Sequence, residues 1–277
     1  MQEGPDLAVS TQASNPTIAA AQVDFDRRFG GIARLYGEAA LLRFRRAHVC
    51  VVGLGGVGSW AAEALARSGA GRLTLIDLDH VAESNVNRQI HALENELGRP
   101  KVSAMADRIR SINPECGVVE IEEFVSSDNV HTLIDQDHDF VIDAVDSTRA
   151  KAALIARCAA SGVPVIVVGG AGGRVDPTRI RVGDLARTEH EPLLAKVRRR
   201  LRHEYGFPRG ERASFGIEAV FSDEPVRYPA DRDRCDTLGD AAPLMGLACA
   251  GYGSSVCVTA AFGLVAVARV LQRLATD

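Results

Sequence analysis

The stretch 49–77 constrains the fold of this 277-residue chain more than any other part of it. A short apolar run leads into a turn with Gly53, Gly55 and Gly58 in G-x-G-x-x-G spacing. An alanine- and leucine-rich segment of helical composition follows, and a second apolar run ends at Asp77. This order predicts a βαβ unit whose glycine turn and helix N-terminus bind phosphate. Asp77 lies about 20 residues beyond the last glycine, where a ribose-binding acid is expected.

Apolar runs alternate with helical segments as far as residue 169. The run at 163–168 is apolar throughout, which is typical of a parallel strand covered on both faces. Further strands are expected at 116–121 and 140–146, and helices at 102–112 and 126–134. The sequence therefore predicts an α/β fold with a doubly wound, mainly parallel Rossmann-like sheet.

The pattern changes after the glycine-rich stretch 169–173. We expect a short hairpin at 174–182 around Asp176-Pro177, a helix from Glu191 and a strand at 215–221. We accordingly divide the chain into a flexible tail (1–22), a nucleotide-binding domain (23–170) and a smaller C-terminal α+β lobe (171–277) packed on the first.

Composition describes an ordinary globular protein, with a net charge of -4 and 46% hydrophobic residues. The six cysteines include no C-x-x-C pair, so neither a disulfide framework nor a structural zinc site is predicted. The first 22 residues contain no Lys or Arg and no long apolar core, so they do not resemble a secretory signal. We expect a cytoplasmic protein with reduced thiols.

The segment 241–268 contains no charged residue and is long enough to be weighed as a membrane span. Glycines and serines interrupt its first half and leave a firmly apolar part of only about 14 residues. A buried core helix is the favoured interpretation, and membrane contact is the alternative.

Polar side chains follow the strand that carries Asp77. The segment that follows the carboxyl end of this strand contains Asn85, Arg88 and Lys101. Open α/β folds bind ligands at the carboxyl ends of their strands. Cations beside a phosphate-binding turn neutralise a triphosphate and its pyrophosphate leaving group. A hydride-transferring enzyme has little use for such a set, so these residues favour ATP over a nicotinamide cofactor.

Two other segments are strongly basic, and each has two interpretations. The helical segment 25–42 carries Arg28 and Arg34, which are either solvated or reach a nucleotide in their own or a partner subunit. A later helix packs five cations into seven residues, which form either a solvated face or a nucleic-acid contact. These five are Lys196, Arg198, Arg199, Arg200 and Arg202.

Several motifs together resemble the adenylating enzymes of the E1-like superfamily. They are GLGGVGS at 53–59, LTLIDLDHVAESNVNRQ at 73–89, GRPK at 98–101 and IDAVDS at 142–147. Others resemble, within that superfamily, the bacterial tRNA threonylcarbamoyladenosine dehydratases. They are RFGGIARLYG at 28–37, NRQIHAL at 87–93, INPEC at 112–116 and GGAGGRVDPT at 169–178. The likeness extends over residues 24–275.

The resemblance implies an ATP site in the 23–170 domain and substrate binding or dimerisation in the C-terminal lobe. The three glycines and Asp77 would bind the phosphates and the ribose. Asn85, Arg88 and Lys101 would contact phosphate oxygens, with Arg88 and Lys101 catalytic. Asp146 would hold Mg²⁺, while Asp143 would be structural. Arg28 or Arg34 would supply a further catalytic arginine, and the residues leave open which.

The reaction implied is the ATP-dependent cyclisation of N6-threonylcarbamoyladenosine at position 37 of ANN-decoding tRNA through an acyl-adenylate. An alternative is adenylation of a ubiquitin-like sulfur-carrier protein, and a third is a nucleotide-binding module without turnover. Carrier-activating relatives usually have C-x-x-C zinc ligands, which this chain lacks. The resemblance also implies a homodimer, cysteine desulfurase or sulfur-acceptor partners, and a monovalent cation. Cys235 lies in a polar stretch without an adjacent His, so it is not assigned to catalysis.

Overall fold

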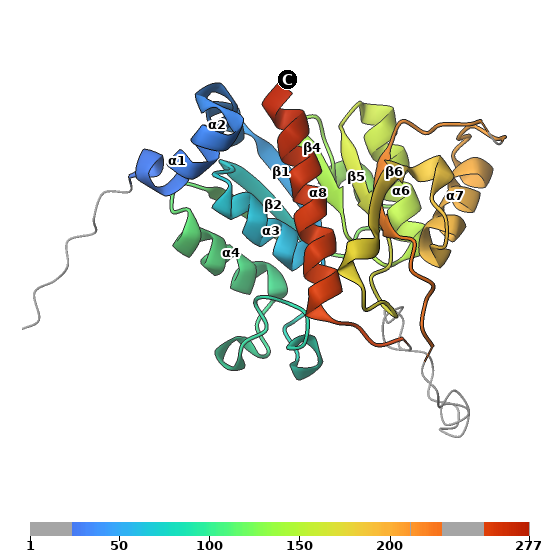
Figure 1. Ribbon diagram of the computed structural model, residues 1–277, viewed down its shortest axis with the longest axis horizontal. Helices are drawn as coiled ribbons and strands as arrows, with labels where there is room; N and C mark the ends of the chain where they lie inside the picture. Colours follow the sequence, from blue (N-terminus) through green and yellow to red (C-terminus); the bar gives the residue numbers. More distant parts are fainter. Residues whose placement is uncertain (1–23, 211, 229–251, 277) are drawn as a thin grey trace, which may run out of the picture.

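The computed structural model describes residues 24–210, 212–228 and 252–276 (Figure 1). The predicted tail, Cys235 and the first part of the uncharged segment therefore lie outside the described residues. The helices, in chain order, are α1 (Phe25–Tyr36), α2 (Glu38–Arg46), α3 (Gly58–Arg67), α4 (Lys101–Ile112), α5 (Val130–Leu133), α6 (Thr148–Ser161), α7 (Pro192–Glu204) and α8 (Val256–Thr276). The 3-10 turns are η1 (Glu83–Asn85), η2 (Glu94–Glu96), η3 (Pro177–Arg179) and η4 (Leu185–Arg187).

One seven-stranded sheet organises the described chain, in the order β3-β2-β1-β4-β5-β7-β6. Its strands are β1 (His48–Val52), β2 (Arg72–Ile76), β3 (Gly117–Ile121), β4 (Phe140–Asp143), β5 (Val165–Val168), β6 (Ile180–Asp184) and β7 (Glu218–Ser222). Every neighbouring pair is parallel except β6 with β7. The predicted α/β fold with a doubly wound, mainly parallel sheet is confirmed.

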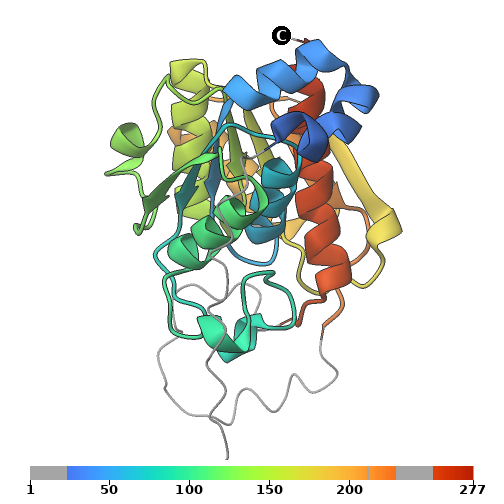
Figure 2. The same cartoon turned by 90° about the vertical axis from the view of Figure 1, so that its left-hand side faces the viewer.

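Helices cover both faces of the sheet (Figures 1 and 2). Successive residues of β1 point to opposite faces, and all five are buried. Val49 and Val51 join the core formed with α2, α3, α4 and α8. Cys50 and Val52 join the core formed with α5, α6 and α7. Two buried faces explain why the central strands read as continuous apolar runs.

Helix α8 lies across the sheet against α3 (Figure 1). Gly263 allows this close approach, since a Cβ there would lie 2.5 Å from the carbonyl oxygen of Val57. By length and composition α8 could also cross a membrane, but eight of its residues are buried, among them Phe262, Ala266 and Val270. In the described part of the uncharged segment α8 therefore packs on the core, and membrane contact stays the alternative prediction.

The predicted hairpin at 174–182 is wrong. Asp176 instead caps η3, its carboxylate accepting the N–H of Thr178 at 2.9 Å. The strand that follows, β6, pairs antiparallel with β7, from Ile180 opposite Ser222 to Asp184 opposite Glu218. An Asp-Pro pair starts a 3-10 turn as readily as a hairpin loop, and the pairing partner lies far along the chain. Both strands extend the main sheet, so the boundary near residue 170 stays a prediction.

Three predicted elements have different limits in the structure. The basic segment 25–42 is divided by Gly37, whose φ of 94° ends α1 and separates it from α2. The helix expected at 126–134 is the single turn α5, because the side chain of Asn129 accepts the N–H of Ser126 in a preceding turn. The strand expected at 140–146 ends at Asp143, and the residues after it form a turn.

Candidate nucleotide-binding site

The glycine turn between β1 and α3 is shaped by close contacts between main-chain atoms. Gly53 has a φ of 87° and lies against Ala144, whose carbonyl oxygen would be 3.0 Å from an added Cβ. A Cβ at Gly58 would lie 1.7 Å from the carbonyl oxygen of Gly53, so no other residue fits there. At Gly55, by contrast, an added Cβ would meet no atom within 4 Å. The turn is therefore packed on its protein side and open at Gly55, where a phosphate can approach the main chain.

Asp77 stands at the rim of this turn, directly after β2. Its Oδ2 accepts the N–H of Leu54 at 2.5 Å and its Oδ1 accepts the N–H of Asp79 at 2.8 Å. Burial raises the pKa of Asp77, while the charge of Lys101 and these two N–H groups act to lower it. Each carboxylate oxygen keeps a further lone pair for a ribose hydroxyl.

The polar segment after Asp77 forms a loop whose two ends, at Asp79 and Lys101, lie side by side. An isolated bridge joins His80 to Pro100, so α4 begins beside Asp79. The Nζ of Lys101 donates to the Oδ2 of Asp79 at 2.8 Å. The Lys101 side chain is only 5% exposed and that of Asp79 is 56% exposed. The ammonium group thus lies below the surface of the site, and the carboxylate faces solvent.

Arg88 lies over the glycine turn. A Cβ at Gly56 would be 3.0 Å from the Cγ of Arg88, which places the arginine stem against the main chain of the turn. The guanidinium donates to the carbonyl oxygen of Ser84 at 2.6 Å and to the Oδ1 of Asn87 at 3.0 Å. Both acceptors are neutral, and Arg88 forms no ion pair with a described carboxylate. Its positive charge is available to an anion in the turn.

Asn85 is buried at the end of η1. Its Oδ1 accepts the N–H of Ala82 at 3.1 Å, which fixes the orientation of the amide. Within the described ranges, its Nδ2 donates no hydrogen bond. The carbonyl of Asn85 also accepts the N–H of Arg88 at 3.0 Å, so the two residues are held in one turn. Asn85 can therefore present an amide donor to a phosphate oxygen.

Asp146 lies exposed in the turn between β4 and α6. The same turn contains Ala144, which contacts Gly53. The pKa of Asp146 is raised, chiefly because the protein around it removes solvent, and further by the charge of Asp79; Lys101 opposes this. No group of three or more His, Cys, Asp or Glu that could hold a metal occurs among the described residues. A lone carboxylate suits Mg²⁺, which keeps waters and takes phosphate oxygens from a nucleotide.

The arginines of α1 lie elsewhere. Arg28 donates to the carbonyl oxygen of Ile112 at 2.7 Å, at the last residue of α4. Helix α4 begins at Lys101, and its 12 residues rise about 18 Å, so Arg28 lies at the opposite end of that helix (Figure 2). Arg34 is exposed on the same helix as Arg28. The contact of Arg28 with the end of α4 does not favour a role at the nucleotide of its own chain, and the predictions for Arg28 and Arg34, in their own or a partner subunit, stay predictions.

The basic helix α7 uses three of its five cations internally. Arg198 donates to the hydroxyl of Thr188, Arg200 pairs with Glu204 at 2.9 Å, and Arg202 stacks over Phe215 at 5.3 Å. Lys196 and Arg199 are exposed, and neither has an ion pair with another described residue. These two, rather than the whole helix face, are available to bind phosphate.

Sequence reasoning missed one charged residue near the site. Lys151 on α6 is buried, and its Nζ donates to the Oδ1 of Asp143 at 2.8 Å. A signal was present, since Lys151 shares helical spacing with the buried residues Leu154, Ile155 and Cys158. A lysine within an apolar stripe requires a buried partner.

Comparison with known proteins agrees with this geometry. Residues 27–276 match the model of the ThiF family. The tRNA threonylcarbamoyladenosine dehydratase of Escherichia coli is 50% identical over 250 residues, which cover 90% of this chain and 93% of that protein. The Haemophilus influenzae dehydratase is 45% identical, covering 93% and 97%. A crystal structure of the Escherichia coli enzyme in complex with ATP superposes with a TM-score of 0.80 and 48% identity, covering 90% of this chain and 94% of that one. The chain therefore belongs to the ThiF family, in the group of the tRNA threonylcarbamoyladenosine dehydratases.

Proposed function

We propose that this protein catalyses the ATP-dependent dehydration of N6-threonylcarbamoyladenosine at position 37 of tRNA. The observation that carries the proposal is the position of Arg88, a cation that pairs with no described carboxylate and lies over a phosphate-binding turn. Two relatives that carry this name match nine tenths of the chain.

The proposed chemistry follows from the charges at the mouth of the turn. The threonine carboxylate of the substrate attacks the α-phosphorus of ATP, and the bond to the β-phosphate breaks. Arg88 and Lys101 stabilise the negative charge that develops on the departing pyrophosphate. Gly55 offers its main chain to the phosphates, and Asp77 accepts hydrogen bonds from the ribose.

The second step needs no nucleophile from the protein. A nucleophilic atom of the carbamoyl group attacks the acyl-adenylate carbonyl, closes a ring and expels AMP, for a net loss of water. The thiols of Cys50, Cys116 and Cys158 are buried, and burial raises the pKa of each above its ordinary value. None of these three is suited to covalent catalysis.

Asp146 is the residue that would hold Mg²⁺. The ion, when bound, would supply positive charge to phosphate oxygens during cleavage. The support for this is the exposed carboxylate beside the glycine turn, together with electrostatic coupling to Asp79 and Lys101.

Substrate recognition is proposed to involve Lys196 and Arg199 of α7, whose charges are free to contact tRNA phosphates. We also propose a homodimer, in which the partner subunit's Arg28 or Arg34 completes the site. The exposed Leu35, 74% accessible at the end of α1, supports a contact there. Mixing an Arg28→Ala, Arg34→Ala chain with an Asp146→Ala chain would restore activity only if residues are shared between subunits. No recovery in verified mixed dimers would contradict this sharing.

Pyrophosphate release tests the function directly. The protein would be given ATP and Mg²⁺ with threonylcarbamoylated tRNA, with the same tRNA lacking the modification, or with a sulfur-carrier protein. We expect release and AMP formation only with the modified tRNA. Release only with the carrier would overturn the proposal, as would a modified adenosine that stays unchanged in nuclease digests. We expect this reaction in the cytoplasm, where tRNA and ATP are available.

A further inference from the structure

A charged pair is completely buried beneath the turn that carries Asp146. Asp143 is the last residue of β4, and Lys151 lies one turn into α6; both side chains are 0% exposed. The ammonium of Lys151 donates twice to Asp143, at 2.8 Å to its Oδ1 and at 3.1 Å to its main-chain oxygen. The lysine therefore fixes both the side chain and the main chain at the end of the strand.

Stability of the fold does not explain this pair. Removing two charges from water costs about as much free energy as their attraction returns, and apolar replacements are often as stable. The Oδ2 of Asp143 is buried and accepts no hydrogen bond from another described residue, which adds to the cost. A buried pair with an unsatisfied oxygen is more readily explained by the geometry that it imposes.

The pair determines the course of the turn 144–147. The Oδ1 that accepts Lys151 also accepts the N–H of Val145, at 3.2 Å. On the other side, Ser147 is the N-cap of α6, and its carbonyl accepts the main-chain N–H of Lys151 at 2.9 Å, so the first turn of the helix fixes this end. Asp146 thus stands between Val145, which is tied to the buried pair, and Ser147, which is held by the helix.

The glycine turn provides the other boundary. The N–H of Ala144 donates to the carbonyl of Val52 at 2.9 Å, and the carbonyl of Ala144 lies against Gly53. The turn is therefore held between the phosphate-binding loop and the Asp143–Lys151 pair. Any shift of Lys151 would move the carboxylate of Asp146 relative to the phosphates.

We propose that Lys151 is a positioning residue that, through Asp143, holds the turn 144–147 so that Asp146 faces the phosphates of the nucleotide. This inference rests on the proposed function, because it assigns Lys151 a role in presenting the carboxylate that would hold Mg²⁺.

The test compares three variants. Asp143→Asn with Lys151→Met removes both charges together and avoids leaving one buried charge unpaired. Lys151→Arg keeps the charge but places a larger, planar group in a site without free space. The control is Glu63→Gln on α3, which removes a buried carboxylate charge that pairs at 2.6 Å with the partly exposed Arg108, away from the turn.

Hydrogen exchange of the nucleotide-free protein is the first measurement. We expect faster exchange in the peptide containing 144–147 for the double variant, a smaller increase for Lys151→Arg, and no change in that peptide for Glu63→Gln. Unchanged exchange in the double variant would overturn the proposal, and so would an equal increase in the control. If the double variant does not fold, the exchange of 144–147 in Lys151→Arg tests the proposal, and unchanged exchange there would overturn it.

Nucleotide affinity is the second measurement, made by calorimetry without and with Mg²⁺. We expect the Mg²⁺-dependent gain in ATP affinity to fall roughly 10-fold or more in the double variant, as in Asp146→Ala, because residues that orient a metal ligand have effects of that size. A wild-type gain in the folded double variant would contradict the proposal. If Mg²⁺ does not raise the ATP affinity of the wild-type protein, the assignment of Mg²⁺ to Asp146 is contradicted. Hydrogen exchange in 144–147 then still decides the role of Lys151.

Discussion

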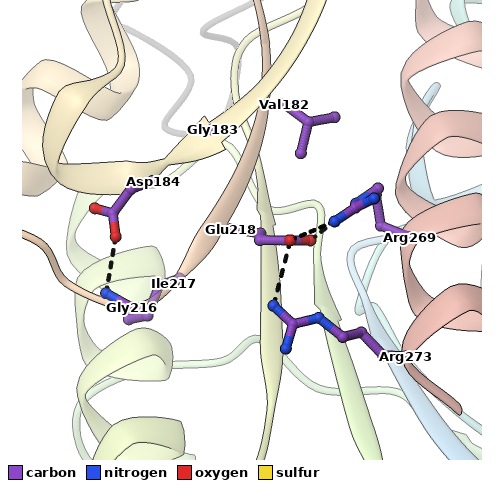
Figure 3. A pocket seen from close by; sticks show the side chains of 8 residues that line it. All are labelled: Val182, Gly183, Asp184, Gly216, Ile217, Glu218, Arg269 and Arg273. Atoms are coloured by element: carbon purple, nitrogen blue, oxygen red, sulfur yellow. Dashed lines mark hydrogen bonds and ion pairs between the residues drawn. The ribbon is translucent and has the colours of Figure 1, made fainter. Parts of the chain in front are cut away.

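Two groups of cations lie at opposite ends of the strands, one at the carboxyl ends and one at the amino end of β7, and they differ in their partners. At the carboxyl edge, Arg88 donates only to neutral oxygens, and Lys101 pairs with the exposed Asp79. At the amino end of β7, Arg269 and Arg273 both pair with Glu218, at 2.6 and 3.3 Å. Figure 3 shows this second group lining a pocket in which the arginines point toward the carboxylate.

The difference teaches that the partners of a cation, more than its charge, identify an anion site. The carboxylate of Glu218 already satisfies the arginines of α8, so an incoming phosphate would have to compete with it. Among the described residues no carboxylate is bonded to Arg88, and the main chain of the glycine turn lies beside it. We therefore place function at the carboxyl edge and structural pairing at the amino edge.

The largest expected effect is that of Lys101→Ala. Removing a buried cation from a water-poor site should lower the rate of cyclisation roughly 10²–10³-fold or more, because the charge of the leaving group is no longer stabilised. The fold should survive, since the exposed Asp79 can be solvated. Single-turnover formation of the cyclic nucleoside, alongside circular dichroism, measures both. Asp79→Asn is the control, because it removes the ion pair of Lys101 but keeps the lysine charge. Turnover of Lys101→Ala at the wild-type rate would remove Lys101 from the mechanism.

Arg88→Ala tests the difference between the two groups of cations, because Arg269→Ala makes the same change in the other group. We expect roughly a 10²-fold loss of cyclisation with little change in thermal stability, since Arg88 pairs with no described carboxylate. Arg269→Ala should show the opposite pattern, with lower stability and unchanged turnover. The two variants would be assayed in parallel for rate and melting temperature. If both lose activity equally, the distinction between the two edges fails.

The same reasoning divides the cations of α7. Lys196→Ala with Arg199→Ala should weaken tRNA binding and lower the salt dependence of log affinity by roughly 0.7–0.9 for each lost phosphate contact. Arg200→Ala should have less effect, because Glu204 already pairs with Arg200. Filter binding over a series of salt concentrations gives the slopes. Equal slopes for wild type and the Lys196, Arg199 variant would assign these residues to a solvated face.

The sequence predicted the parts of this molecule that depend on local pattern. Gly53, Gly58 and Asp77 are set by spacing along one βαβ unit, and their contacts lie within or directly beside it. The central strands were recognisable because both of their faces are buried. The sequence predicts that Asn85, Arg88 and Lys101 lie together because their segment leaves the carboxyl end of β2. The structure holds Asn85 and Arg88 in one turn and places Lys101 beside Asp79.

What could not be predicted depends on pairing over long distances in sequence. The partner of β6 is β7, which the local pattern at Asp176-Pro177 did not reveal. The direction of α4 carries Arg28 away from the nucleotide, and only the assembled fold shows this. The apolar stripe of α6 indicates that Lys151 is buried, but helical spacing alone does not identify Asp143, on a neighbouring strand, as its partner.

The smallest expected effect concerns Glu218, at the amino edge. Hydrogen bonds from Arg269, with further attraction from Arg273, hold the pKa of Glu218 below its ordinary value of 4.5. A depressed pKa in the folded state contributes stability above that ordinary value, and the contribution is lost as the pH falls through the folded-state pKa. Glu218→Gln should therefore lower the free energy of unfolding by about 1 kcal/mol near neutral pH, and by less in acid.

Urea unfolding of wild type and Glu218→Gln at neutral pH and at a pH below the ordinary glutamate value measures this difference. Cyclisation at neutral pH should be unchanged, because Glu218 lies at the edge of the sheet opposite the glycine turn. A stability loss that is equal at both pH values would mean that packing, rather than charge, accounts for the effect. A loss of turnover would contradict the assignment of this group to structure and would make the pocket between β6, β7 and α8 part of the reaction.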